Sequence, residues 1–107
     1  MPRKKSLEEL LQAAQDNDPD CVIFLQDELK LFEPNFELVK ALVETDSNRI
    51  LETNESGSNS LHLACGNIEN MSMELLVLLM GKSPDAVTAA NKFGLTPLHK
   101  AVMAFIS

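Results

Sequence analysis

The sequence has no Trp, no Tyr, only four Gly and only two Cys among its 107 residues. No apolar run approaches the roughly 20 residues needed to cross a bilayer, and the N-terminus lacks the apolar segment of a secretory signal. Cys21 and Cys65 lie far apart among apolar residues, which favours reduced core thiols over a disulfide framework. We therefore expect an intracellular, cytoplasmic protein with no membrane partner.

Basic residues are also scarce. The sequence has 9 Lys and Arg residues and 16 Asp and Glu residues, which gives a net charge of -7. Residues 6–57 hold 13 acidic and 3 basic residues, a balance of -10, whereas residues 58–107 hold 3 of each. Residues 1–5 carry the remaining +3 and are expected to be a disordered basic tip. An acidic surface repels phosphate groups, so nucleic acid is not expected as a partner.

Apolar residues recur at helical spacing, and no long run of alternating β-branched residues is present, so we predict an all-α fold. The chain of 107 residues is long enough for one domain. Ser6 and Glu9 form a capping box that begins a first helix, which the polar segment 16–19 ends.

Asp18 is expected to cap a second helix over about 19–32, with Pro19 at its first position. Pro34 ends that helix, and Asn35 caps a third over about 35–45. Later elements are expected as helices at about 60–66, 71–81 and from 97, a single helical turn after Ser83 and Pro84, and polar turns at 53–59 and 91–94.

An internal repeat appears when the sequence is compared with itself at an offset of 37 residues. Phe36 to Leu42 then aligns with Met73 to Leu79, and Ile50 aligns with Val87. The order of Asn, Gly, Leu, His and Ala is also kept, in the pairs Asn54/Asn91, Gly57/Gly94, Leu61/Leu98, His62/His99 and Ala64/Ala101. Leucines alone can match by chance, but this ordered set rarely does.

Each residue of the repeated segment has a local structural role. Gly57 and Gly94 permit the positive φ of a tight turn, and Asn59 or Thr96 caps the helix that follows. Pro97 suits the first helical position, where Ser60 is expected to replace it without cost. Two further pairs complete the motif: Leu61 and Leu98 are expected in the core, and Ala64 and Ala101 allow close packing of inner helices.

The segment Gly94 to Ala101, GLTPLHKA, resembles the ankyrin signature G-x-T-P-L-H-x-A, and Gly57 to Ala64 is a weaker copy. The resemblance implies a solenoid of stacked repeats, each a turn, a short inner helix and a longer outer helix. The repeat of 37 residues in this chain is longer than the common ankyrin repeat of about 33 residues. Ankyrin-like repeats of this longer kind occur in unicellular eukaryotes. The resemblance covers residues 35–107 well and residues 6–34 only loosely.

We interpret residues 1–107 as a single ankyrin-repeat domain. Its expected parts are an N-terminal helical cap at 6–34, an outer helix and turn at 35–56, a full repeat at 57–93 and a truncated repeat at 94–107. The first helix is either a cap on the pair 19–32 and 35–45, or part of a first repeat that carries an insertion. The alignment favours the cap, because it makes 35–45 an outer helix.

Val102, Met103, Phe105 and Ile106 are expected to be partly exposed at the C-terminal edge. Such an apolar edge predicts either a fragment of a longer repeat protein or self-association through this end.

His62 and Cys65 have an H-x-x-C spacing that could suggest a metal site. Zinc normally takes four ligands, and no second pair completes the set. The ankyrin resemblance instead gives His62 and His99 a structural role at the turn and helix cap. A Cys65 nucleophile would need an oriented base and an oxyanion site, which the sequence does not supply. We therefore expect no metal, no cofactor and no enzymatic activity.

The ankyrin resemblance also predicts where a partner protein binds, because such repeats use their turn tips and inner helices. By position, the contact residues are Glu55, Ser56, Ser58, Lys92, Phe93 and Leu95. Phe93 is either an exposed anchor or a side chain covered by a neighbouring repeat. We thus expect a protein-binding scaffold. The alternatives are a regulatory or targeting module of a larger protein, which could be an enzyme, and, less favoured, a metal-dependent activity.

Overall fold

The computed structural model describes residues 5–106, and this part of the chain is all-helical with no strand. The expected basic tip therefore lies outside the described residues, apart from Lys5. The α-helices are α1 (Leu7–Gln15), α2 (Cys21–Leu29), α3 (Phe36–Thr45), α4 (Ser60–Gly66), α5 (Met73–Lys82) and α6 (Pro97–Ile106). Three 3-10 helices connect them: η1 (Ser47–Ile50), η2 (Ile68–Asn70) and η3 (Pro84–Val87). The prediction of an all-α fold is confirmed.

Polar caps begin α1, α3 and α5, and those of α1 and α3 were predicted from the sequence. The Ser6 hydroxyl accepts from the Glu9 N–H, and the Glu9 carboxylate accepts from the Ser6 N–H, which completes the capping box of α1. Asn35 Oδ1 accepts from the third N–H of α3 at 2.9 Å. Ser72 caps α5 in the same way, so short polar side chains satisfy backbone donors that have no partner within the helix.

The second helix is shorter than expected at both ends. Asn17 has a φ of 54°, and Asp18 Oδ1 accepts from the Asp20 N–H at 2.8 Å, which holds Pro19 in the turn. The helix therefore begins at Cys21 rather than at Pro19. At its other end, the side-chain amide of Asn67 donates to the carbonyls of Leu29 and Leu31, both at 2.9 Å. These bonds satisfy the carbonyls of a helix that has ended at Leu29 rather than continuing to about residue 32.

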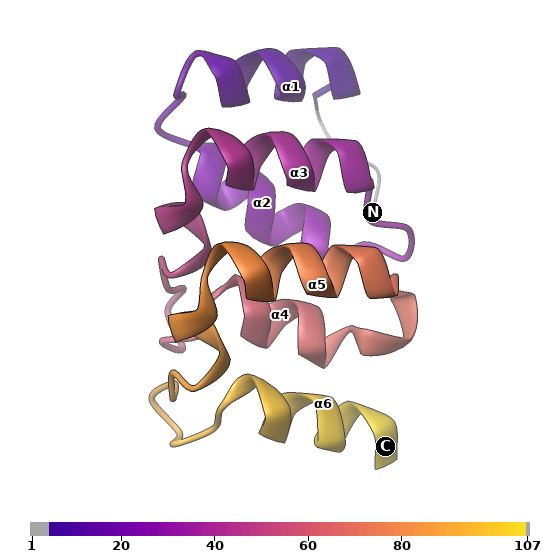
Figure 1. Cartoon of the computed structure of the whole chain (residues 1–107), viewed down its shortest axis with the longest axis vertical. Helices are drawn as coiled ribbons and strands as arrows, with labels where there is room; N and C mark the ends of the chain where they lie inside the picture. Colours follow the sequence, from indigo (N-terminus) through magenta and orange to yellow (C-terminus); the bar gives the residue numbers. More distant parts are fainter. Residues whose placement is uncertain (1–4, 107) are drawn as a thin grey trace.

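The six helices lie in two stacked layers (Figure 1). We call α1, α3 and α5 the first layer, because α1 packs against α3 and α3 against α5. The second layer contains α2, α4 and α6, which pack in the same succession. Within the stack, α2 lies beside α3 and α4 lies beside α5. Successive helices alternate between the layers, so the five connections between them fall on two opposite sides of the molecule.

The core lies between the two layers, and its large, fully enclosed side chains are Leu25, Leu29, Leu38, Leu42, Ile50, Leu61, Leu75 and Leu79. Leu61 is in the core as predicted, but the prediction for Leu98 is wrong, because that side chain is 70% exposed. Met73, at the start of α5, is likewise 74% exposed. In both cases no described residue covers the face of α6 or α5 that carries the side chain.

A buried arginine connects the first three helices, and the sequence gives no hint of it. Arg49, in η1, is 4% exposed. Its guanidinium donates to the Leu42 carbonyl at 2.7 Å, to the Thr45 hydroxyl and to Asn17 Oδ1 at 2.8 Å. A cation near the last carbonyls of α3 also interacts favourably with the helix dipole. Arg49 thus fixes the turn before α2 against the end of α3.

Ser60 contradicts the expectation that it replaces proline without cost. It is fully buried at the start of α4, and its hydroxyl has no hydrogen-bond partner among the described residues. A buried hydroxyl without a partner costs about 1–3 kcal/mol. The matching Pro97 begins α6 and carries neither a hydroxyl nor an N–H.

We expect Ser60→Pro to stabilise the protein by about 1 kcal/mol, through loss of the unpaired hydroxyl and a stiffer unfolded chain. Asn59 has a φ of -88° and a ψ of -179°, an extended conformation that proline tolerates in the residue before it. Urea unfolding measures the change, and Ser60→Ala separates the hydroxyl from the proline effect. If both variants are less stable than the wild type, the hydroxyl is not a liability.

Candidate functional site

The turn between η1 and α4 is held by the side chain of Asn54. Asn54 Oδ1 accepts from the N–H groups of Ser56 at 2.9 Å and Ser58 at 3.1 Å. The backbone of Asn54 also exchanges hydrogen bonds with Ser58 and Gly57. Gly57 has a φ of +73°, as its role in the turn requires. A single asparagine therefore fixes the backbone of the whole turn.

The turn before α6 repeats this arrangement at the atomic level. Asn91 Oδ1 accepts from the N–H groups of Phe93 at 2.9 Å and Leu95 at 3.0 Å. The Asn91 N–H donates to the Leu95 carbonyl at 2.8 Å, and Gly94 has a φ of +75°. The alignment at 37 residues thus corresponds to a repeated hydrogen-bond pattern, and both predicted turns are confirmed.

The two turns are joined directly to each other. The Lys92 N–H donates to the Ser56 carbonyl at 3.0 Å, and the Asn91 side-chain amide donates to the Ser58 hydroxyl at 3.1 Å. The approach is close, because a Cβ on Gly57 would lie 3.1 Å from the Lys92 nitrogen. We call this pair of joined turns, residues 52–58 and 91–95, the turn face.

His62 fixes the turn face to the helices behind it. It is fully buried, and its Nδ1 accepts from the Asn59 N–H at 3.1 Å. A backbone N–H can only donate, so the ring proton is on Nε2, which lies 2.8 Å from the Leu95 carbonyl. Asn59 Oδ1 in turn accepts from the N–H groups of Leu61 and His62, which caps α4 as predicted. Ala64, one turn further along α4, is fully buried.

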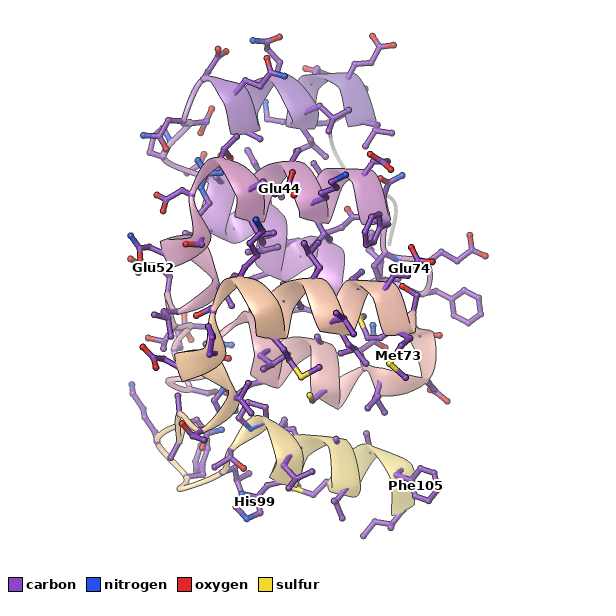
Figure 2. All side chains as sticks on the ribbon, viewed as in Figure 1. Glu44, Glu52, Met73, Glu74, His99 and Phe105 are labelled. Carbon is purple, nitrogen blue, oxygen red and sulfur yellow. The ribbon has the colours of Figure 1, made fainter. Side chains whose placement is uncertain are left out.

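His99 repeats only half of this role. Its Nδ1 accepts from the Thr96 N–H at 2.9 Å and lies 2.9 Å from the Thr96 hydroxyl. The predicted cap by Thr96 is weaker than that of Asn59, since its hydroxyl lies 3.4 Å from the His99 N–H. Figure 2 shows His99 on the side of α6 away from α4, where it is exposed. Ala101, on the other side of α6, is half-buried.

The predicted contact residues divide into exposed and buried groups. Glu55, Lys92 and Phe93 are exposed. Phe93 is 73% exposed, so its side chain is not covered by a neighbouring repeat. Ser56 and Leu95 are half-buried. Ser58, expected at the surface, is only 5% exposed, because Asn91 and the second turn cover it. Ser58 therefore belongs to the joint between the turns.

Glu52 is a surface residue of the turn face that sequence reasoning missed. It is exposed beside the first turn, and Figure 2 shows its side chain on the same side of the molecule as the turns. Its carbonyl accepts from the Gln26 side chain at 3.3 Å, which fixes its backbone. The available signal was its position one residue before the predicted 53–59 turn.

The histidine and cysteine side chains are engaged in the fold. Both ring nitrogens of His62 have hydrogen-bond partners, so metal ligation would break the cap or the joint between the turns. Within residues 5–106, no group of three or more His, Cys, Asp or Glu residues is arranged to hold a metal. Burial raises the pKa of the Cys65 thiol, which disfavours the nucleophilic thiolate. Burial likewise raises the pKa of Cys21, whose sulfur lies 3.4 Å from the Ala13 carbonyl.

Comparison with known proteins does not identify a family for this chain. No protein-family model, no curated protein and no solved structure matches it. None of the described helices is both long and apolar enough to cross a membrane. The geometry of the turn face is thus the basis for assigning a function.

We expect Gly57→Ala to destabilise the protein more than Gly94→Ala. Both glycines have positive φ, which costs an alanine about 1 kcal/mol. Only the Gly57 methyl would also press on Lys92, since no atom lies within 4 Å of the Cβ position at Gly94. Chemical unfolding of the two matched variants measures the difference. Equal losses of stability would mean that the two turns are not in close contact.

Proposed function

We propose that this chain is a protein-binding scaffold of the ankyrin type, which holds a partner protein on its turn face. Three features support the ankyrin assignment together. The sequence repeats at 37 residues, the helices lie in two layers, and the two turns share one hydrogen-bond pattern. The resemblance of Gly94 to Ala101 to the ankyrin signature adds the expectation that the turns contact partners.

The exposed ring of Phe93 is the observation that carries the proposal. It projects from a turn whose backbone is held by Asn91, because Asn91 Oδ1 accepts from the N–H groups of Phe93 and Leu95. A large apolar side chain on a rigid backbone loses little entropy when it is buried in a partner. The second turn is itself attached to the first through Lys92 and to α4 through His62. Phe93 is therefore an anchor on a pre-ordered surface.

The charges beside the ring indicate the kind of surface that fits. Glu52 and Glu55 are exposed on the first turn, and Lys92 is exposed next to Phe93 on the second. A suitable partner offers an apolar pocket for the ring and basic side chains opposite the two glutamates. Charges at such a rim contribute to association rate and specificity more than to affinity.

We expect Phe93→Ala to weaken binding of the captured partner by about ten-fold or more, as for a buried aromatic anchor. Phe32→Ala is the matched control, because Phe32 is 78% exposed in the loop between α2 and α3, on the side opposite the turns. Partners are captured with the wild-type chain, and the affinity of each variant is then measured by calorimetry. If the two alanine variants bind the partner with equal affinity, Phe93 is not part of the interface.

Glu55→Lys tests the charged part of the same surface. We expect slower association with the captured partner and a smaller dependence of the association rate on salt, since one attractive charge is reversed. Stopped-flow or surface-binding kinetics at two salt concentrations measure both quantities. Glu8→Lys, on α1, is the control because Glu8 is exposed on a helix far from the turn face. Identical kinetics for the two variants would contradict the proposed orientation of the partner.

A further inference from the structure

A groove of about 300 Å³ lies between the turn after α1 and the chain that follows α3. Its lining residues fall within 17–22 and 46–52, and both segments lie on the same side of the molecule as the turn face (Figure 1). Glu52, labelled in Figure 2, belongs both to the groove and to the turn face. We call this surface the Arg49 groove. Its volume is at the lower end of the range for ligand sites, which suits a short segment of chain.

Arg49 lines this groove, although the residue is only 4% exposed. An arginine has five N–H donors. Nη1 donates to the Leu42 carbonyl and the Thr45 hydroxyl, and Nη2 donates to Asn17 Oδ1. The Nε–H and the second N–H of Nη2 therefore have no hydrogen-bond partner among residues 5–106.

The unused Nε–H of Arg49 is not sealed inside the protein. Ser60 Oγ is the sole fully enclosed side-chain nitrogen or oxygen of the described residues that lacks a partner, so Nε is accessible. Among the same residues no carboxylate forms an ion pair with Arg49, and all of its hydrogen-bond partners are neutral groups. A buried charge with unused donors is costly, and a further acceptor lowers its free energy.

Three carboxylates line the same groove: Asp18, Asp46 and Glu52. Asp18 Oδ1 accepts from the Asp20 N–H at 2.8 Å, and Asp46 Oδ1 accepts from the Asn48 N–H at 3.1 Å. These bonds fix both aspartate side chains. The Oδ2 atoms of the two aspartates have no hydrogen-bond partner within the described part of the chain, so they can accept from a ligand.

The charges of the groove select the chemistry of its ligand. Three carboxylates and one guanidinium leave a balance of -2, which repels a free anion. The carboxylates are not grouped to hold a metal ion within residues 5–106, and the guanidinium repels one. A ligand that fits therefore presents an uncharged acceptor to Arg49 and basic groups to the carboxylates.

An extended peptide segment with basic side chains offers both kinds of group. Its main-chain carbonyl is an uncharged acceptor, and its Lys or Arg side chains carry the positive charge. Side chains two positions apart in an extended chain point the same way, so two basic residues at this spacing can meet the carboxylates together. The groove is continuous with the turn face through Glu52, which places such a segment beside the partner held there.

We propose that the Arg49 groove binds a basic, extended segment of the partner protein. A main-chain carbonyl of the segment accepts from Arg49, and its Lys or Arg side chains pair with Asp18, Asp46 and Glu52. This inference rests on the proposed function, because the segment belongs to the partner that the turn face holds. The groove adds a contact that does not use Phe93.

The probe for this proposal is a labelled peptide with blocked ends, acetyl-Ala-Arg-Ala-Arg-Ala-amide. Fluorescence anisotropy with the full chain at low salt is expected to show saturable binding. The same peptide with citrulline in place of both arginines keeps the main-chain carbonyls but has no charge, and it is expected to bind at least about ten-fold more weakly. Free L-arginine is expected to compete only weakly, because its carboxylate meets the negative balance of the groove.

Two matched variants of the chain locate the binding surface. The double variant Asp46→Asn with Glu52→Gln removes two charges from the groove, and asparagine keeps the acceptor that Asp46 offers to Asn48. It is expected to weaken binding of the arginine peptide by about ten-fold or more. Asp27→Asn with Glu33→Gln is the control, since it changes the net charge equally at two exposed positions outside the groove. Circular dichroism checks that each variant is folded.

The contact with Arg49 is read without mutating it. The chain has two arginines, so Arg3→Lys leaves Arg49 as the sole source of an arginine Nε–H signal in ¹H–¹⁵N spectra. Saturation with the arginine peptide is expected to shift this signal and to slow its exchange with water, because a carbonyl then accepts from Nε.

Four results with the peptide would each overturn the proposal. They are absence of saturable binding, equal affinity of the two double variants, an unchanged Arg49 Nε–H signal at saturation, and binding of free L-arginine as tight as that of the peptide. The second result would show attraction by overall charge, and the fourth would make the ligand a free amino acid.

The captured partner separates this proposal from the turn face. Asp46→Asn with Glu52→Gln is expected to weaken its binding more than the control double variant does, and equal affinities would overturn the groove. Phe93→Ala is expected to leave binding of the arginine peptide unchanged. If Phe93→Ala also leaves binding of the captured partner unchanged, the assignment of the turn face is wrong and the groove stands on its peptide results.

Discussion

The imidazole of His62 is the contact on which the arrangement of the two turns depends. Its Nδ1 accepts from the Asn59 N–H at the start of α4, and its Nε2 reaches the Leu95 carbonyl of the following turn. One buried side chain therefore orders a helix start and the next connection at the same time. Because each ring nitrogen has a fixed role, only one neutral tautomer satisfies both partners. The hydrogen bonds between the turns, from Lys92 to Ser56 and from Asn91 to Ser58, extend the same joint to the surface.

The sequence predicted features that depend on nearby residues. The capping box of Ser6 and Glu9, the cap by Asn35 and the positive φ of Gly57 all involve partners within a few positions. The 37-residue repeat also located the two turns correctly, because the same residues make the same hydrogen bonds in both copies. His62 was expected to bond the turn and the cap, and its contacts agree with that role.

Features that depend on distant contacts could not be predicted in this way. Arg49 and Asn17 are 32 residues apart, and no local pattern signals their hydrogen bond. Leu98 matches the buried Leu61, yet its exposure is set by what lies beside α6 rather than by its own sequence context. Ser58 was expected at the surface because the ankyrin resemblance indicates where a residue lies in the turn but not whether it is buried. Sequence reasoning thus identified the turn face but not which of its residues are accessible.

The chain presents two surfaces of different character. The acidic segment 6–57 forms α1, α2 and α3, and it ends in the first turn with Glu52 and Glu55. The charge-balanced segment 58–107 contains α4, α5 and α6, together with exposed apolar side chains. A polar surface with one aromatic anchor suits the folded partner protein proposed above. The same repeat geometry generates both, since it fixes the turns in register and leaves equivalent helix faces at each level.

The most direct test of the account is the tautomer of His62, read from the ¹⁵N chemical shifts of its ring in a long-range ¹H–¹⁵N correlation spectrum at neutral pH. The account predicts a neutral ring protonated at Nε2, with Nδ1 unprotonated, because Nδ1 accepts from the Asn59 N–H. A ring protonated at Nδ1, or one that exchanges rapidly between the two tautomers, would contradict the joint between the cap of α4 and the turn at Leu95.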